Sequence, residues 1–355
     1  MILPTALAVN EILPSNLRAI GLMPFIFYLP ALGLVTLVDA LAQRLARPYL
    51  ANTGFLVLCG VVLVAEGLAL NRLYFDVWGA DPALFVATDG DLTAVADFLN
   101  NLPPRPDETI FVAALHYQHP TIAYLSDRYG EVKWLPGSAA FVLPAEGSAL
   151  YIYPINSPLP DWAEPFLAGA TALPTVNGPD GQPAFVAYRL TAVPPINPPH
   201  AQAVHFGGAV TLLGYDVGAA AAGETAPLTL YWRIDAVPGA DFTPFAHLED
   251  AWGARWSQAQ TFAYPVAQWQ AGDVVVQRVN VPVPAGAPPG DYRVRLGWFD
   301  EASGERLPVL DGDGRFAGDS LVIEGLAVTA GTPPDPLPTP PFVVNEPIRR
   351  GLQLL

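Results

Sequence analysis

The sequence predicts a mixed fold with two transmembrane helices, a small α/β (Rossmann-like) domain and an all-β sandwich domain. Two long stretches near the N-terminus are almost free of charge, helix and strand patterns alternate over residues 73–191, and only short strand patterns follow residue 202. Charged residues make up 14% of the chain, against about 25% in soluble domains. This composition is typical of a membrane-attached protein.

Residues 19–38 carry no charge, and about 20 such residues cross a bilayer. A second uncharged run covers residues 48–65 and extends to Asn71 if Glu66 lies near the interface. We therefore expect two spans within residues 19–72, preceded by an external loop remnant at residues 1–18. Aromatic residues of the kind found at membrane interfaces flank the second run, namely Tyr49, Tyr74 and Trp78.

The orientation of the spans is left open by their flanking charges. Arg44 and Arg47 lie at the short connection between them, but Arg18 and Arg72 lie at the opposite ends. We do not expect the first run to be a secretory signal, because no basic region precedes it and no small-residue cleavage pattern follows it.

Negative charge is concentrated after residue 72, where the chain carries 30 of its 33 acidic residues and 13 of its 17 basic ones. Such a surface repels phosphate backbones, so nucleic acid is not an expected partner. The single cysteine, Cys59, excludes an intrachain disulfide and a cysteine-based zinc site. Its apolar surroundings predict a small packing residue.

Residues 73–191 are predicted to form the α/β domain. Residues 90–102 show helical spacing of apolar residues, and residues 119–130 begin a second helix with Pro120 in its first turn. Strands are predicted at residues 109–115, 148–155 and 184–190. No GxGxxG motif or P-loop occurs, so no nucleotide site and no cofactor is predicted.

A proline-rich linker is predicted at residues 192–202, a β-sandwich at 203–329 and a proline-rich tail at 330–355. Residues 293–298 illustrate the sandwich pattern. Val294, Leu296 and Trp298 alternate with Arg293 and Arg295, which is typical of a half-buried antiparallel strand.

Several stretches together resemble the C-terminal part of a membrane glycosyltransferase of family 39, which is related to protein O-mannosyltransferases and aminoarabinose transferases. These are "LPSNLRAIGLMP" (13–24), which leads into the first span, "YFDVWGADP" (74–82), just after the last span, and "HPTIAYL" (119–125), in the following domain. The sandwich is similar to a module appended to some members, in the stretches "LLGYDV" (212–217), "LTLYWR" (228–233), "FAHLED" (245–250), "PPGDYRVRLGWFD" (288–300) and "GERLPVL" (304–310).

The resemblance implies transfer of a sugar from a polyprenyl phosphate to an acceptor hydroxyl on the outer face of the membrane. A carboxylate in the first external loop would act as general base, and basic groups would hold the lipid phosphate. It also implies that Arg44 and Arg47 are cytoplasmic and that the bulk of the chain is extracytoplasmic, at the cell membrane.

The chain departs from this pattern because the catalytic carboxylate belongs to an early loop of a bundle with many spans. Here we expect two spans and a start that resembles a late external loop. Nothing matches Glu11 to the family's base, so no catalytic residue is predicted. Arg18, in the matching position, is a candidate contact for a lipid phosphate or a plain interfacial anchor.

Other polar motifs were weighed against structural roles. His116 and His119, near Asp127, lack the further ligands that a metal site needs and are expected to be structural or capping residues. "DGDGR" (311–315) lacks the later ligands of a calcium loop and is expected to be a turn. No metal site is predicted.

Three tryptophans near predicted turns, Trp252, Trp256 and Trp269, are candidates for stacking on a sugar ring, with core packing as the alternative.

Two functions follow as hypotheses. In the first, the chain is the non-catalytic C-terminal part of a polyprenyl-phosphate-dependent glycosyltransferase. Its partners would be the bilayer, a polyprenyl-phosphate sugar and a catalytic membrane half, and its external domains would position the acceptor or glycan. In the second, it is a stand-alone, membrane-anchored module that binds glycans or proteins.

Overall fold

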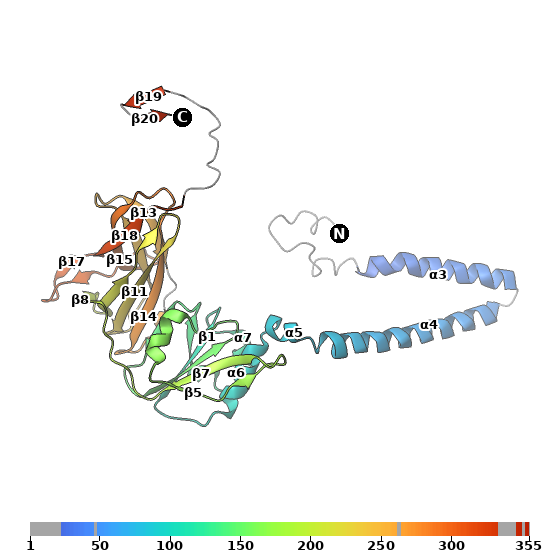
Figure 1. Cartoon of the computed structure of the whole chain (residues 1–355). Coiled ribbons are helices and arrows are strands. Elements are labelled where there is room, and N and C mark those ends of the chain that lie inside the picture. The colour runs from blue at the N-terminus through green and yellow to red at the C-terminus, as the bar shows by residue number, and fades with distance from the viewer. Residues whose placement is uncertain (1–22, 46–47, 261–263, 333–345, 350–351, 355) are drawn as a thin grey trace. The chain divides into compact units, whose positions relative to one another are not determined.

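The computed structural model describes residues 23–45, 48–260, 264–332, 346–349 and 352–354 (Figure 1). The chain separates into two compact units, Met1–Asp81 and Pro82–Leu355. Arg18, Glu11 and the predicted loop remnant at residues 1–18 lie outside the described residues, as does the proline-rich part of the predicted tail at 333–345. Near the C-terminus, β19 (Glu346–Arg349) and β20 (Leu352–Leu354) form an antiparallel pair.

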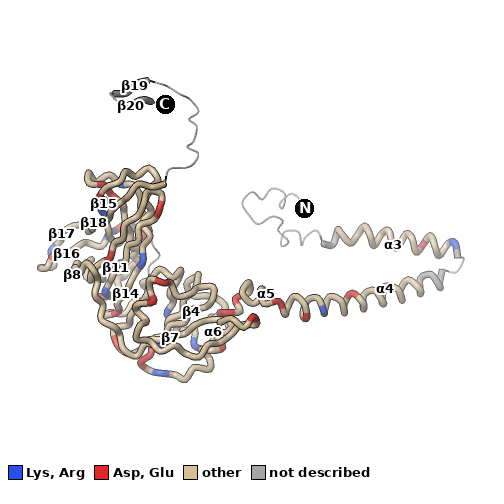
Figure 2. Tube along the Cα trace, viewed as in Figure 1, with Lys and Arg blue, Asp and Glu red and all other residues tan. Residues whose placement is uncertain are grey.

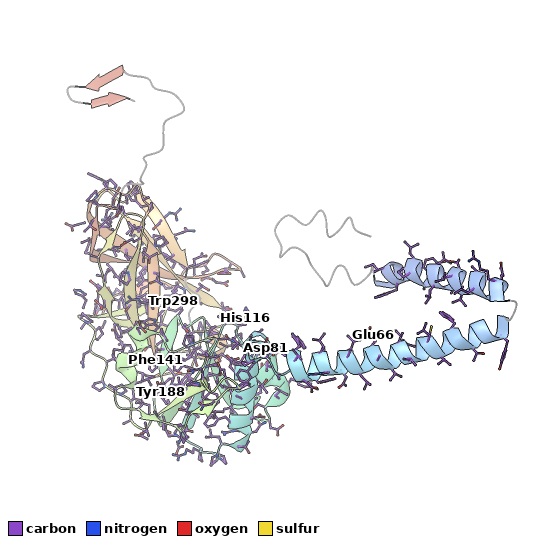
Figure 3. The ribbon with its side chains drawn as sticks, turned by 45° about the vertical axis from the view of Figure 1, so that its right-hand side comes forward. Glu66, Asp81, His116, Phe141, Tyr188 and Trp298 are labelled. Carbon is purple, nitrogen blue, oxygen red and sulfur yellow. The ribbon has the colours of Figure 1, made fainter. Side chains whose placement is uncertain are left out.

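The first unit contains two long apolar helices, α3 (Met23–Leu45) and α4 (Pro48–Asn71), and a π-helical segment η2 (Arg72–Trp78) continues α4. Figure 2 shows few charged residues along both helices, and Figure 3 labels one of them, Glu66 on α4. Residues 26–44 and 53–78 are long and apolar enough to cross a membrane, which confirms two helices of the predicted kind.

The apolar side chains of these helices remain exposed in the chain by itself, and Ala42 is the one buried residue among their described side chains. A helix that is apolar all round is typical of a core helix or a membrane span, and these two lack a protein core around them. Cys59 lies partly exposed on α4 as a free thiol. In η2, the Tyr74 and Trp78 rings lie 4.9 Å apart, as expected for an interfacial aromatic pair.

The second unit begins with helices and a mixed sheet. Strands β1 (Glu108–Ala114), β2 (Val132–Pro136) and β4 (Ser148–Pro154) are parallel, and β7 (Pro183–Leu190) is antiparallel to β4. The sheet order is β2-β1-β4-β7-β5, with β6 beside β7. The remaining elements of this part are α5 (Pro82–Ala87), α6 (Gly90–Asn101), α7 (Pro120–Leu125), η3 (Tyr129–Glu131), η4 (Asp161–Leu167), β5 (Thr171–Ala172) and β6 (Val176–Asn177).

The helices and strands predicted for this region from residues 90, 109, 119, 148 and 184 onward are all present. Helix α6 buries the apolar stripe expected from its spacing, which includes Leu92, Val95 and Leu99, against the sheet residues Ile110 and Ile152. The periodicity of the sequence therefore places α6 on the sheet.

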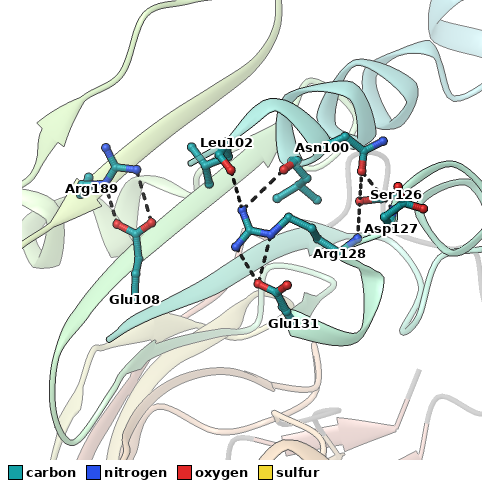
Figure 4. Close-up of polar contacts among 9 residues, drawn as sticks. Asn100, Leu102, Glu108, Ser126, Asp127, Arg128, Glu131 and Arg189 are labelled. Carbon is teal, nitrogen blue, oxygen red and sulfur yellow. Dashed lines mark hydrogen bonds and ion pairs between the residues drawn. The ribbon is translucent and has the colours of Figure 1, made fainter. Parts of the chain in front are cut away.

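Polar contacts between its elements hold this part together (Figure 4). The Asn100 side chain accepts hydrogen bonds from Ser126 Oγ at 2.9 Å and from the Asp127 amide at 3.0 Å, which ties α6 to the end of α7. Glu108, on β1, forms a bidentate ion pair with Arg189 on β7, the shorter contact being 2.6 Å. Both of these side chains are largely buried.

Two further sheets pack face to face as a β-sandwich. One has the order β10-β18-β15-β12-β13, and the other β17-β16-β8-β9-β11-β14-β3. Their bounds are β3 (Ala140–Leu143), β8 (His200–Phe206), β9 (Val210–Val217), β10 (Ala220–Ala221), β11 (Thr225–Ile234), β12 (Phe242–Glu249), β13 (Arg255–Gln260), β14 (Val274–Pro282), β15 (Gly290–Asp300), β16 (Val309–Leu310), β17 (Phe316–Gly318) and β18 (Leu321–Thr329); η5 (Val266–Gln268) precedes β14.

The alternation predicted at residues 293–298 is confirmed on β15. Val294, Leu296 and Trp298 are buried, whereas Arg293 and Arg295 lie on the outer face of the sheet.

Strand β3 joins the α/β part to the sandwich. Along the chain it lies between β2 and β4, yet it pairs with β14 of the sandwich. One continuous core therefore contains Phe111 and Phe141 together with Trp298 (the last two labelled in Figure 3). The α/β part and the sandwich share this core within a single compact unit.

Candidate functional site

A polar groove of about 700 Å³ lies along strands β13 and β14 of the sandwich. We call it the β13–β14 groove. Its walls come from the two strands, from the turn between β2 and β3, and from η4. It is lined by Gly137, Ser138, Ala139, Trp162, Gln258, Ala259, Gln260, Arg278, Asn280 and Pro282.

Strand alternation places polar side chains in this groove. On β14, Val279 and Val281 point into the core, so Arg278 and Asn280 point to the opposite side. On β13, which is the edge strand of its sheet, Gln258 and Gln260 are both exposed for the same reason. Four polar side chains thus converge from two different sheets.

Most hydrogen-bonding groups of the groove are available to a ligand. Within the described part of the chain, the amides of Gln258, Gln260 and Asn280 make no hydrogen bond. Arg278 Nη1 donates to Thr229 Oγ1 at 2.7 Å, which leaves further guanidinium donors. Burial lowers the pKa of Arg278, but a guanidinium stays charged at neutral pH.

Trp162 supplies an apolar surface to the groove. It lies in η4, is half-buried and packs against the shared core. Its indole ring contacts no other aromatic ring among the described residues. The accessible part of Trp162 and the amides across the groove therefore offer the combination of apolar and hydrogen-bonding groups found in ligand pockets.

The turn at one rim of the groove has an uncommon backbone. Gly137 and Ser138 have φ values of 62° and 52°, a left-handed conformation that a non-glycine residue adopts rarely. It is held on both sides, because the Gly137 amide donates to the Ala114 carbonyl at 2.9 Å and the Arg278 amide donates to the Ala139 carbonyl at 2.8 Å. Such conformations persist where the surroundings enforce them, often at ligand sites.

The described lining of the groove consists of amide, hydroxyl, guanidinium and apolar groups. None of the described residues that line it is a carboxylate, a histidine or a cysteine, the side chains that most often act as general acid or base.

Of the predicted sugar-stacking residues, Trp252 is the most accessible, with 90% of its surface exposed. It lies in the turn between β12 and β13, where Asp250 accepts hydrogen bonds from the amides of Trp252 and Ala254. The Trp256 indole also donates to Asp250, at 3.1 Å, and this bond is the main reason that the pKa of Asp250 is lowered. Stacking on Trp252 stays a prediction.

For Trp269 the structure shows the alternative role, core packing. Its ring is 5% exposed, its indole donates to the Tyr264 carbonyl at 2.8 Å, and it packs edge-on against Trp298 with ring centroids 5.6 Å apart. Trp256 is half-buried and edge-on to Tyr292, so only part of its ring is accessible. The aromatic residue that lines the groove is Trp162, which the sequence analysis did not single out.

The remaining motifs have the structural roles expected of them. His119 caps α7, because its Nδ1 accepts a hydrogen bond from the Thr121 amide at 3.4 Å, and the His116 ring (labelled in Figure 3) lies 6.4 Å from it. In the DGDGR motif, Asp311 Oδ1 accepts from the amides of Asp313 and Arg315, which forms a turn between β16 and β17. Among the described residues, no cluster of potential metal ligands occurs.

Alternating polar residues in the sequence indicate the two polar strand faces that line the groove. In "RWSQAQ" (255–260), glutamines recur at alternate positions, and "RVN" (278–280) repeats the pattern with Arg278 and Asn280. Such alternation predicts a polar face on each strand. The sequence does not show that the two faces meet, since 17 residues separate the two motifs.

No family model matches the chain, and no curated protein matches it. Among solved structures, the chain is similar to the CARDB domain of the PF1109 protein from Pyrococcus furiosus, determined in complex with di-metal ions. That alignment covers 33% of this chain and 90% of the domain, at 9% identity and a TM-score of 0.22. A TM-score this low carries no inference about the fold or function of this chain.

Proposed function

We propose that this chain is the non-catalytic, membrane-anchored C-terminal part of a family 39 type glycosyltransferase, and that its second unit binds a saccharide. The β13–β14 groove carries the binding part of this proposal. Trp162 offers apolar indole surface, and three unbonded amides offer both donors and acceptors. A saccharide presents the matching surfaces, an apolar ring face and many hydroxyl groups.

The membrane part of the proposal is supported by the two apolar helices. The resemblance of the sequence to family 39 supports an extracytoplasmic second unit, with the connection between α3 and α4 in the cytoplasm. The parallel order of β2, β1 and β4, with α6 before β1 and α7 between β1 and β2, supports a Rossmann-like classification of the α/β part.

We assign glycan binding to this chain and catalysis to another one because of the chemistry of the groove. Among the described residues of its lining there is no carboxylate, histidine or cysteine, and we assign the transfer reaction to a separate catalytic membrane half that uses the polyprenyl-phosphate sugar. This unit would hold the acceptor glycan near that half. The same observation also favours a second candidate function, a stand-alone membrane-anchored glycan receptor.

Binding is tested with the full chain in lipid nanodiscs on an array of oligosaccharides, followed by calorimetric titration of the best binder. We expect Trp162→Ala and the double variant Gln258→Ala/Gln260→Ala to weaken binding by at least about tenfold, because each removes ~1.4 kcal/mol or more of contact. Gln182→Ala is the matched control, since Gln182 is an exposed glutamine outside the groove.

Trp252→Ala distinguishes saccharide binding in the groove from binding at the exposed tryptophan of the β12–β13 turn. Binding lost in Trp252→Ala but retained in Trp162→Ala would assign the saccharide to the hairpin and overturn the groove. If no saccharide binds the wild-type chain, the proposed function fails. Copurification of the chain with a multi-span membrane protein would favour the accessory part of a transferase. Purification without such a partner would favour a stand-alone receptor.

A further inference from the structure

A second cavity, of about 220 Å³, lies on the outer face of the sheet that contains β12, β13 and β15. Gln260 lines both this cavity and the β13–β14 groove, so the two adjoin at the edge strand. The cavity is lined by Phe245, His247, Arg255, Gln260, Phe299, Gly304 and Arg306, none of which is acidic.

Positive charge is concentrated here, although the chain as a whole carries a net charge of −16. Arg255 and Arg306 line the cavity, and Arg293 and Arg295 lie on the same face of the sheet. The pairing of β12 with β13 and β15 brings these side chains together from separate strands.

The acidic residues nearby do not neutralise this cluster. Glu249 pairs with both Arg295, at 2.7 Å, and Arg293, at 3.5 Å. Asp319 pairs with Arg306 at 2.9 Å. Arg255 forms no ion pair or hydrogen bond with any described residue, so its guanidinium is available to a ligand. Two carboxylates thus pair with three of the four guanidinium groups.

Aromatic rings shape the cavity. The Arg306 guanidinium lies over the Phe245 ring, 4.8 Å from its centroid, which orients its planar face. Phe245 occupies the space above Gly297, where a Cβ atom would lie 2.5 Å from the ring. Phe299 lies edge-on to Phe245 with centroids 6.1 Å apart. The cavity therefore has apolar walls beside its cationic groups.

The pKa of His247 is consistent with a positive potential in the cavity. Burial lowers the pKa of His247, and Arg255 and Arg306 lower it further. The ring is therefore largely neutral at pH 7, and it can donate one hydrogen bond to a ligand without adding a charge. An anion held between the two arginines would lie beside this ring.

We propose that this cavity binds the carboxylate of an acidic saccharide, such as a uronic acid residue, through Arg255 and Arg306. The inference rests on the proposed function, because it names the class of glycan that the adjoining groove would take. The charged sugar would occupy the cavity, and neighbouring neutral sugars would continue past Gln260 into the groove. Guanidinium groups bind carboxylates through paired hydrogen bonds, which gives charge and geometric selectivity.

The test compares trigalacturonate with galactotriose, two probes of equal length, by calorimetric titration of the full chain in nanodiscs of zwitterionic lipid at 0.15 M salt. We expect trigalacturonate to bind at least about tenfold more tightly. Arg255→Gln should abolish this preference and leave galactotriose binding unchanged, because the Arg255 side chain is exposed and forms no ion pair or hydrogen bond with a described residue. Arg306→Gln should reduce the preference.

Arg315→Gln serves as the control, because Arg315 is an exposed arginine that pairs only with Asp313, in another turn. Equal affinity for the two probes, or a preference that survives Arg255→Gln, overturns the anion site while the groove remains supported. Binding of neither probe, together with a negative oligosaccharide array, defeats the proposed function instead. Sulfate that displaces trigalacturonate from wild type but not from Arg255→Gln would support the site as a general anion site.

Discussion

The Phe141 ring stacks on the Tyr151 ring with centroids 4.6 Å apart and planes at 20°, although the two residues belong to different sheets. Phe141 lies on β3, in the sandwich, and Tyr151 lies on β4, in the α/β sheet. The Tyr151 hydroxyl also donates to the Val142 carbonyl at 2.6 Å. Burial raises the pKa of Tyr151 well above its usual range, so this bond persists at any physiological pH.

This contact predicts that the α/β part and the sandwich unfold together. Phe141→Ala should lower the free energy of unfolding by about 3–5 kcal/mol, because it removes a fully buried ring from the shared core. Urea unfolding of the full chain in detergent, followed by tryptophan fluorescence and by far-UV circular dichroism, measures the change.

A single transition, shifted equally for both probes, is expected. The matched control is Phe316→Ala, since Phe316 is 71% exposed and its loss should cost little. Two separate transitions in the wild type would show that the sheets are independent domains.

The Glu108–Arg189 ion pair offers a second prediction. Arg189→Met leaves the Glu108 carboxylate buried without its partner and should cost about 3–5 kcal/mol of unfolding free energy. The double variant Glu108→Leu/Arg189→Met should recover most of this loss, because both charges are then absent. For comparison, Arg315→Ala breaks the exposed pair with Asp313 and should cost less than about 1 kcal/mol. A double variant no more stable than Arg189→Met would contradict the prediction.

His247 should make stability depend on pH. Its pKa in the folded chain lies below the ordinary 6.5, so the unfolded chain binds more protons in the interval between the two values. The contribution of His247 to stability is therefore complete above pH 6.5 and is lost as the pH falls toward the folded pKa. His247→Gln should remove this part of the pH dependence.

The same residue can be followed by NMR, with its ring signal assigned by comparison with His247→Gln. Its titration midpoint should lie below 6.5 in the free chain and rise when trigalacturonate binds, because a nearby carboxylate favours the imidazolium. A free midpoint at or above 6.5 would contradict the positive potential described for the cavity.

Orientation in the membrane is tested with thiol labelling. Cys59 is the single cysteine, so Cys59→Ser gives a background into which Arg315→Cys is introduced, because that site is exposed. A membrane-impermeant maleimide should label this variant in intact cells if the second unit is extracytoplasmic. Labelling only after cell lysis would place the unit inside the cell.

Membrane attachment itself predicts that alkaline carbonate leaves the full chain in the pellet. The same extraction should release a variant that lacks residues 1–81, since those residues contain both apolar helices. Release of the full chain would contradict the spans.

The sequence by itself determined the local elements. Charge-free length identified α3 and α4, a period of 3.6 residues identified α6, and alternation identified β15, because each pattern reflects burial that neighbouring residues share. The capping role of His119 and the turn at residues 311–315 were also predicted, since both depend on residues a few positions apart.

Only the tertiary structure decided which distant residues meet. In the sequence, strand β3 lies between β2 and β4 of the α/β sheet, but it pairs with β14 of the sandwich. The sheet that β3 joins is therefore set by shape and burial in the assembled core. For the same reason Trp269 is buried while Trp162 lines a groove, and Arg255 joins Arg306 across neighbouring segments. Burial and convergence depend on packing in three dimensions, which composition and spacing along a chain do not specify.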